Sequence, residues 1–131
     1  MTRNMDNPVS VTTDVLQQIL DAFNRHDLDA IMAFFAVDAV FEAPRGPDTW
    51  GRRFVGKDRV REGLAARFIG IPDVHYGDDT HWVCGNRGVS EWTLTGTTTD
   101  GVRLNVRGCD LWEFRDGAIV RKDSFWKIVE S

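Results

Sequence analysis

Cysteine is scarce in this chain, where Cys84 and Cys109 are the two found among 131 residues. Their separation matches no metal-ligand spacing, and disulfide-stapled secreted domains use more cysteines than this. The N-terminus also lacks a signal-peptide pattern. We therefore expect a cytoplasmic protein whose thiols stay reduced and pack as small apolar groups.

Long apolar runs and clusters of basic residues are missing as well. No stretch approaches about 18 consecutive apolar residues, so the pattern of a transmembrane helix is absent. The net charge of −4 and the scattered Lys and Arg residues are unlike a nucleic-acid-binding surface. His26, His75 and His81 have no metal-ligand spacing, and there is no phosphate-binding loop or dinucleotide fingerprint. The sequence therefore predicts no metal, no cofactor, no nucleic acid and no membrane among its partners.

What the chain does have is a large apolar fraction, 42% of its residues, and five tryptophans. A chain of 131 residues with this composition buries roughly two-thirds of its unfolded surface. We expect residues 1–131 to form a single domain, with the polar residues 1–11 flexible.

Periodicity predicts three helices and a series of strands. Thr12 or Thr13 caps the first helix, Asp27 caps a short second one, and the third spans Lys57–Phe68. The predicted strands are Val40–Ala43, Val74–Cys84, Val89–Thr98, Val102–Phe114 and Ala118–Val129.

The segment Arg45–Phe54 is rich in Gly and Pro, contains Trp50, and is predicted as a loop, either over a cavity or simply solvated. Helices grouped before a meander of strands favour an α+β fold, with the helices against one face of a curved sheet. A strongly bent sheet closed by helices makes a cone, and a cone of this size leaves a small-molecule pocket.

The segment Val102–Ile128 is predicted to be one long β-hairpin with a nearly pure apolar face. Asp110 is the charged exception on that face, which otherwise bears Leu104, Val106, Gly108, Trp112 and Phe114. A three-residue loop at Arg115–Gly117 sets Asp110 opposite Lys122. A two-residue loop shifts the register by one and sets Asp110 against Asp123, which like-charge repulsion disfavours.

Asp110 allows two interpretations. If it faces an apolar interior, its charged form loses hydration, which suits a group that gives or takes protons in a pocket. If it pairs with Lys122 across the hairpin, the charge is stabilised again and the pair serves to hold the register. Both interpretations stay open at the level of the sequence.

Five segments carry a family resemblance, namely Phe23–Ala30, Phe41–Pro44, Phe54–Asp58, Glu91–Gly96 and Asp116–Val120. Together they resemble the nuclear-transport-factor-2-like superfamily and, within it, the SnoaL-like group, over nearly the whole chain. The resemblance implies a cystatin-like α+β barrel, in which a cone-shaped curved antiparallel sheet wraps around three N-terminal helices. It implies function less sharply, because the superfamily includes isomerases, cyclases, dehydratases, epoxide hydrolases and non-catalytic binders.

Two enzyme types of this superfamily can be compared with the chain residue by residue. In ketosteroid isomerases a Tyr and an Asp supply much of the chemistry, and the matching positions are Ile19 and Ala43, so steroid isomerisation is not expected. A further carboxylic acid of that isomerase site, an oxyanion donor, aligns with Asp110. In limonene-type epoxide hydrolases an Arg and two Asp activate a water, and the aligned positions here are Glu91, Thr93 and Ser124.

The direction of Glu91 stays open. Trp92 and Leu94 point inward by their hydrophobicity, which puts Glu91 outside, whereas the alignment with the hydrolases puts Glu91 inside.

The resemblance implies a protein that binds a small hydrophobic molecule and performs cofactor-free proton transfer of isomerase, cyclase or dehydratase type. Its expected catalytic residues are Asp110, Lys122 and Glu91. The expected substrate-binding residues are Phe41, Trp50, Trp112, Ser124 and Trp126. The alternative is a non-catalytic ligand-binding or dimerisation domain of the same fold. A homodimer is expected through the outer face of the meander, which bears Cys109 and Leu111.

Overall fold

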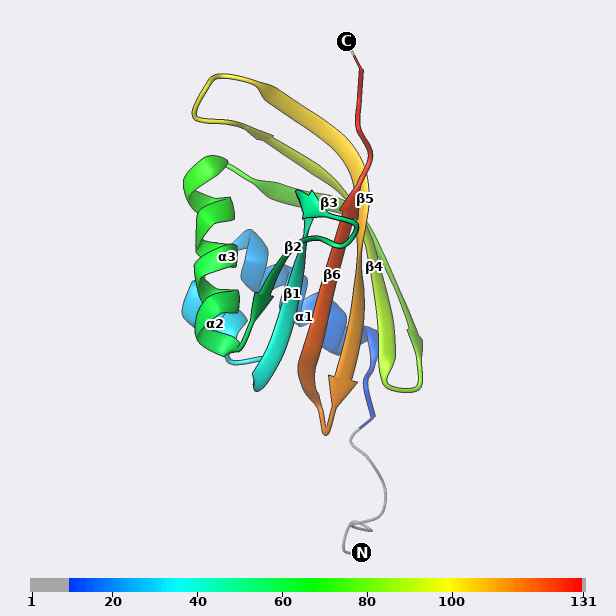
Figure 1. Cartoon of the computed structure of the whole chain (residues 1–131). Coiled ribbons are helices and arrows are strands. Elements are labelled where there is room, and N and C mark those ends of the chain that lie inside the picture. The colour runs from blue at the N-terminus through cyan, green and yellow to red at the C-terminus, as the bar shows by residue number, and fades with distance from the viewer. Residues whose placement is uncertain (1–9, 131) are drawn as a thin grey trace, which may run out of the picture.

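The computed structural model describes residues 10–130 of the chain. Its elements, shown in Figure 1, are α1 (Thr13–Asn24), α2 (Leu28–Met32), β1 (Phe35–Asp48), β2 (Gly51–Val55), α3 (Lys57–Gly70), β3 (His75–Cys84), β4 (Arg87–Thr97), β5 (Arg103–Arg115) and β6 (Ala118–Trp126).

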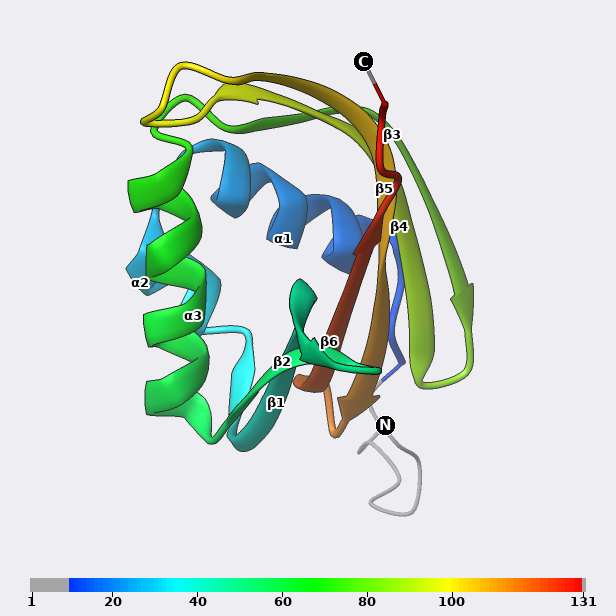
Figure 2. The same cartoon turned by 45° about the horizontal axis from the view of Figure 1, so that its top comes forward.

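The six strands form one sheet in the order β2-β1-β6-β5-β4-β3. β1 runs parallel to β6, and the other neighbouring pairs are antiparallel. The sheet is strongly curved, and the three helices lie on its concave side, as Figure 1 and Figure 2 show. Alternate residues of each strand therefore face the helices, while the others face away from them. The predicted α+β fold, a curved sheet around three helices, is confirmed.

The helices begin where the sequence predicts. The side chain of Thr12 accepts a hydrogen bond from the backbone N–H of Val15 at 3.2 Å, which caps α1. Asp27 caps α2 in the same way through the N–H of Ala30 at 3.1 Å. α1 then buries an apolar stripe against the concave face of the sheet, made of Leu16, Ile19, Leu20, Ala22 and Phe23.

The segment predicted as a loop, Arg45–Phe54, is instead part of the sheet. β1 begins at Phe35 and continues past Pro44 to Asp48, and β2 folds back onto it. The β1–β2 register shifts between Ala43 and Asp48, so Pro44 lies where a missing N–H interrupts no regular ladder. The prolines therefore mark an irregular stretch of a strand and not its end.

The register of the β5–β6 hairpin also differs from the predicted one. Asp116 (φ 52°) and Gly117 (φ 82°) have the positive φ angles of a tight two-residue turn. A bulge a few residues further along shifts the ladder by one more position. Asp110 consequently faces Ser124 and not the predicted Lys122, although all three side chains project to the same side of the sheet.

The first eleven residues, predicted to be flexible, lie mostly outside the described part of the chain. Residues 1–9 are not described, and Val11 is buried in the core.

Candidate functional site

Four polar side chains form a row across the concave face of the sheet, one from each of β3, β4, β5 and β6. The register aligns His81 with Ser90, Ser90 with Asp110, and Asp110 with Ser124. Residues aligned in this way project to the same side of a sheet. Ser90, Asp110 and Ser124 are buried, so this polar row crosses the interior of the molecule.

Asp110 is the centre of the first cluster in this row, and it is only 3% exposed. Its Oδ1 accepts hydrogen bonds from Lys122 Nζ at 2.8 Å and from Ser124 Oγ at 2.5 Å. Its Oδ2 accepts one hydrogen bond, from Trp92 Nε1 at 3.0 Å. Three donors therefore hold a buried carboxylate in a fixed orientation, and Oδ2 keeps room for one further donor.

Lys122 lies beside Asp110 among aromatic rings and is 4% exposed. Its Nζ also donates to Ser124 Oγ at 2.6 Å. The same atom lies 4.8 to 5.5 Å from the ring centroids of Phe23, Phe41 and Trp112. Burial lowers the pKa of Lys122 below its ordinary value of 10.5, and this effect exceeds the opposing attraction of Asp110. The amine can therefore release its proton more readily than an exposed lysine does.

A second cluster starts from the other end of the row. Asp79 Oδ2 lies 2.8 Å from His81 Nε2, and His81 Nδ1 lies 2.8 Å from Ser90 Oγ. When the ring is neutral and Asp79 accepts from Nε2–H, Nδ1 is left to accept the Ser90 hydroxyl proton. Ser90 Oγ in turn accepts from Trp112 Nε1 at 3.0 Å. Ser90 is 1% exposed, so this arrangement orients Trp112 and does not present a nucleophile to solvent.

Tyr76 and Arg67 lie beyond the polar row, at the side of the cone where α3 ends. Tyr76 is buried, and its hydroxyl accepts a hydrogen bond from Arg67 Nη1 at 3.1 Å. Burial raises the pKa of Tyr76 above its ordinary value of 10.0. Asn24 fixes the backbone of Tyr76 through two hydrogen bonds of 2.9 Å. Arg67 also covers the ring of Trp126, with its Cζ 4.5 Å from the ring centroid.

Most of the site residues predicted from the sequence come together in this interior. The structure gathers Asp110, Lys122, Ser124, Phe41 and Trp112 into one cluster. Trp126, also predicted as a substrate-binding residue, is half-buried and projects from the same face two residues beyond Ser124, under Arg67.

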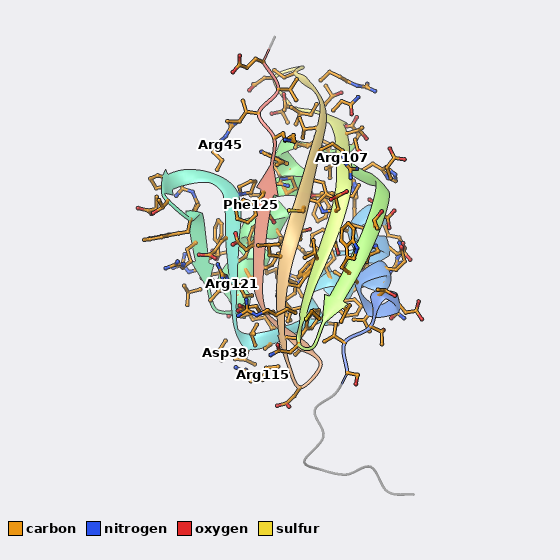
Figure 3. All side chains as sticks on the ribbon, turned by 90° about the vertical axis from the view of Figure 1, so that its right-hand side faces the viewer. Asp38, Arg45, Arg107, Arg115, Arg121 and Phe125 are labelled. Carbon is orange, nitrogen blue, oxygen red and sulfur yellow. The ribbon has the colours of Figure 1, made fainter. Side chains whose placement is uncertain are left out.

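Glu91 and Trp50 do not join the cluster. Glu91 lies on the convex face, where Arg107 Nη2 donates to it at 2.7 Å, and Figure 3 shows Arg107 on that face. The apolar side chain of Trp92 takes the inward position, so the parity of β4 turns Glu91 outward. Trp50 lies at the β1–β2 turn, is 43% exposed, and stacks under Arg53 at 4.3 Å.

A buried carboxylate on the convex face was not predicted. Glu42 is 2% exposed and lies between Arg53 and Arg121, with N–O distances of 2.7 and 2.6 Å. Burial would raise the pKa of Glu42, but hydrogen bonds from Arg53 and Arg121 outweigh it and hold the pKa below its ordinary value of 4.5. This cluster fastens β1 to β2 and β6 and is separated from Asp110 by the thickness of the sheet.

The sequence also contained a signal for the second cluster. Gly85-Asn86, between two predicted strands, is a turn signal, and a two-residue turn there places His81 opposite Ser90. The same count puts Ser90 on the inward face with Trp92. The registers of the β3–β4 and β4–β5 hairpins, taken together, connect the His81–Ser90 cluster with the Asp110 cluster. The pattern of a single strand does not contain this information.

Two hollows of the described residues can be compared with the interior cluster. The larger, about 410 Å³, lies where the β3–β4 and β5–β6 turns meet, beside Asn86 and Asp116. The smaller, about 230 Å³, lies on the convex face beside Leu111. Neither is lined by Asp110 or Lys122. Because these two side chains are only 3% and 4% exposed, a ligand reaches the buried pair only when neighbouring side chains move.

Residues 10–130 contain no group of three or more His, Cys, Asp or Glu side chains arranged to hold a metal ion. No helix within the same range is both long and apolar enough to cross a membrane.

The fold and the interior cluster define a class of protein, an α+β cone with ionisable groups on the inner face of its sheet. Residues 16–122 match the model of the SnoaL-like domain, so the chain belongs to that family. No curated protein is significantly similar to the chain.

Solved structures share this fold. A candidate polyketide cyclase from Xanthomonas campestris pv. campestris is 25% identical, with a TM-score of 0.76 over 88% of this chain and 89% of that one. A protein of unknown function with a cystatin-like fold from Xanthomonas campestris is 19% identical, with a TM-score of 0.77 over 88% and 90% of the two chains. A Catenulispora acidiphila protein with a ketosteroid isomerase-like fold, in complex with trimethylamine, is 16% identical, with a TM-score of 0.77 over 90% and 88%. These likenesses confirm the resemblance and the cystatin-like fold inferred from the sequence.

Proposed function

We propose that this protein catalyses cofactor-independent proton transfer on a small hydrophobic carbonyl compound, in a reaction of isomerase, cyclase or dehydratase type. The observation that carries the proposal is the buried pair of Asp110 and Lys122, joined at 2.8 Å and surrounded by aromatic rings. Stability alone gives little reason for such a pair, because apolar replacements of buried ion pairs are often neutral or stabilising. Ionisable groups with perturbed environments are typical of sites that move protons.

Asp110 is the proposed general base, and Oδ2 is the atom that takes the proton. Oδ1 already has two hydrogen-bond partners, while Oδ2 has one, from Trp92. In the forward step Oδ2 removes a proton from the carbon next to the substrate carbonyl, and the carbonyl oxygen gains the negative charge as an enolate. The protonated Asp110 then returns the proton to a different carbon or to a leaving oxygen.

Lys122 is the proposed electrostatic partner in this step. Its ammonium neutralises Asp110 before the reaction, and its charge stabilises the enolate when Asp110 has become neutral. Ser124 bridges the two groups, since it contacts both Asp110 Oδ1 and Lys122 Nζ. The membership of the SnoaL-like family and the likeness to a candidate polyketide cyclase support chemistry of this type.

The second candidate function is ligand binding without turnover. It is favoured by the complete satisfaction of the interior, because in the described residues no buried side-chain nitrogen or oxygen lacks a hydrogen-bond partner. A pair that is already satisfied by its own chain gains less from a reacting substrate. The two candidates differ in whether Asp110 ever exchanges its proton with a bound molecule.

Exchange of carbon-bound hydrogen for deuterium separates the candidates. With 2-tetralone as probe in D₂O, wild-type protein is expected to accelerate exchange at the carbons beside the carbonyl, as followed by NMR. Asp110→Asn should remove the acceleration and Lys122→Met should reduce it, while Glu62→Gln, in an exposed ion pair, should leave it unchanged. Folding of each variant is checked by circular dichroism.

Two results would decide against turnover of such ketones. Binding of 2-tetralone with an exchange rate equal to that in buffer would leave the ligand-binding candidate. Exchange that persists in folded Asp110→Asn protein would refute Asp110 as the base.

We further propose that two copies associate through the convex face of the sheet. Leu111 and Phe125 are 41% and 50% exposed there, and Figure 3 shows Phe125 with Arg107 and Arg121 on this face. The charged groups around them are balanced, because the face pairs Arg107 with Glu91 and Arg121 with Asp123. A patch that carries both signs and apolar groups is suited to contact a second copy of itself about a twofold axis.

A further inference from the structure

Arg67 differs from the other arginines of the described chain that form no ion pair. Within residues 10–130, most arginines lie within 4.0 Å of a carboxylate. Those without such a partner are exposed, with the exception of Arg67, which is half-buried; the exposed ones are Arg25, Arg45, Arg52 and Arg103. A partly desolvated guanidinium without a counter-charge is unfavourable, and binding an anion would relieve that cost.

Three elements converge on the Arg67 guanidinium. Arg67 stands in the last turn of α3, Trp126 at the end of β6, and Tyr76 near the start of β3. The ring of Trp126 lies against one side of the guanidinium at 4.5 Å, and Tyr76 receives one of its N–H groups. Stacking uses a face of the planar group, so the remaining in-plane N–H donors stay available for a ligand.

The Tyr76 hydroxyl is a second available donor. It accepts the hydrogen bond from Arg67, and among the hydrogen bonds of the described residues its own proton has no acceptor. The raised pKa keeps this phenol protonated, so it can donate. Arg67 and Tyr76 can therefore donate to one shared acceptor oxygen or to the two oxygens of one carboxylate.

The charge balance of the interior favours an anion at this place. Asp110 and Lys122 neutralise one another at 2.8 Å, which leaves the positive charge of Arg67 uncompensated. Burial is the main cause of the lowered pKa of Lys122, and the positive charge of Arg67 lowers it further. The charge of Arg67 therefore acts on the interior cluster. An anionic ligand would supply the missing negative charge.

We infer that Arg67 and Tyr76, backed by the Trp126 ring, form an anchor for a carboxylate, and that the substrate is a hydrophobic carboxylic acid. The inference rests on the proposed function, since it names the substrate class of the same interior. The carboxylate binds at Arg67, near the end of α3, and the apolar part of the molecule extends toward the aromatic residues around Lys122. A carboxylate fits the planar guanidinium better than a rounder anion does, because two parallel hydrogen bonds can form.

A pair of matched probes tests the anchor. 2-Naphthoate and 2-naphthamide have the same shape, but the first carries a carboxylate and the second a neutral amide. Wild-type protein is expected to bind 2-naphthoate about tenfold more tightly or better, as measured by calorimetry and by quenching of tryptophan fluorescence. Arg67→Gln should abolish the preference, while Arg103→Gln, which removes an exposed unpaired arginine, should retain it.

Two further variants keep the test decisive if Arg67→Gln does not fold. Tyr76→Phe retains the buried ring and removes the hydroxyl, and it should reduce the preference several-fold. Arg67→Lys retains the charge but lacks the planar fork, so its preference should fall between those of wild type and Arg67→Gln. Equal binding of both probes to wild-type protein, or a preference that persists in Arg67→Gln, would overturn the anchor.

The anchor and the proton transfer can fail separately. No preference for 2-naphthoate, together with Asp110-dependent exchange of 2-tetralone, would refute the anchor and leave the proton transfer in place. A preference for 2-naphthoate without any exchange of 2-tetralone would refute the proton transfer and leave the anchor in place.

Discussion

At the residue scale, the interior depends on charges that have partners from their own chain. Asp110 has three donors and Lys122 two acceptors, so neither group needs water. Removing one member of such a pair leaves the other charge buried without compensation, which costs far more than the pair contributes as a whole.

The pair is therefore expected to respond unequally to single and double substitution. Lys122→Met should lower the free energy of unfolding by about 3 kcal/mol, because the Asp110 carboxylate loses its buried counter-charge. Adding Asp110→Asn should recover a large part of that loss. Urea denaturation measures the stability of the single and the double variant. Arg61→Met, which breaks an exposed pair with Asp29, is the control and should change the free energy of unfolding by about 0.5 kcal/mol at most. A double variant as unstable as the sum of the singles would contradict this account.

Glu42 predicts how the stability depends on pH. The pKa of Glu42 is held below 4.5 in the folded protein by Arg53 and Arg121, against the effect of burial, whereas the unfolded chain titrates near its ordinary value. Between these two values the unfolded state binds more protons. The stability that Glu42 contributes is therefore complete above about pH 4.5 and is lost as the pH falls through the folded pKa.

Glu42→Gln should thus make the free energy of unfolding less dependent on pH below about 4.5. At neutral pH the same variant should cost about 2 kcal/mol, because two charge-assisted hydrogen bonds are weakened. Urea denaturation from pH 7 downward measures both effects. Glu62→Gln, in an exposed pair, serves as the control and should leave the profile unchanged. An unaltered acid slope in Glu42→Gln would show that other carboxylates govern acid unfolding.

Single residues were predictable from the sequence where the parity of one strand decides their direction. The inward direction of Asp110 followed from its apolar neighbours. Its contact with Lys122 was predicted from a three-residue loop that does not form, and in the structure Lys122 reaches Asp110 from the position opposite Trp112. The direction of Glu91 could not be settled, because hydrophobicity and family alignment disagreed, and the burial of Trp92 decides it. The sequence gives His81 no metal-ligand spacing, and its hydrogen-bond partner Ser90 lies on another strand, so the pattern of one strand does not predict their contact.

At the scale of elements, the helix caps were predicted well and the connections between strands less well. Thr12, Asp27 and the turn at Gly85-Asn86 act through local chemistry that the sequence states directly. β2 was missed because its pairing with β1 is an irregular ladder beside two prolines. A two-residue turn does form at Asp116-Gly117, and alone it would set Asp110 opposite Asp123. A bulge next to the turn shifts the register by one residue, so Asp110 lies opposite Ser124 and the two carboxylates are not paired.

Gly108 shows what the sheet requires to hold the cluster in place. A Cβ added at Gly108 would lie 2.5 Å from the Trp92 ring and would also collide with the carbonyl oxygen of Phe125. Gly108→Ala should therefore destabilise the protein by about 2 kcal/mol and displace Trp92 from Asp110. Denaturation and near-ultraviolet circular dichroism measure the two effects. Gly70→Ala, where a Cβ meets nothing within 4 Å, is the control and should be neutral or slightly stabilising.

At the scale of the whole molecule, the two faces of one curved sheet have different chemistry. The concave face carries most of the aromatic rings and, apart from Glu42, the buried polar side chains, and the helices cover it (Figure 2). Among residues 10–130 no helix lies over the convex face, which carries ion pairs with apolar side chains between them. The alternation of residues along each strand predicts this division. The interior polar row depends in addition on the registers of three hairpins, so it could not be predicted until all three registers were known.

The uncovered face leads to the last prediction, on assembly. Leu111→Asp or Phe125→Asp would bury a charge in the proposed contact between two copies, and each should weaken association about tenfold or more. Sedimentation at micromolar concentration measures the change. Ile69→Asp places the same charge at an apolar residue that is 73% exposed on α3, away from the sheet, and should leave association unaltered. Leu111 and Phe125 lie on the outward side of β5 and β6, the same strands that carry Asp110 and Lys122 on their inward side, so a contact there would stiffen the sheet beneath the proposed site. Wild-type protein that stays monomeric at micromolar concentration would rule out the dimer and leave the interior chemistry untouched.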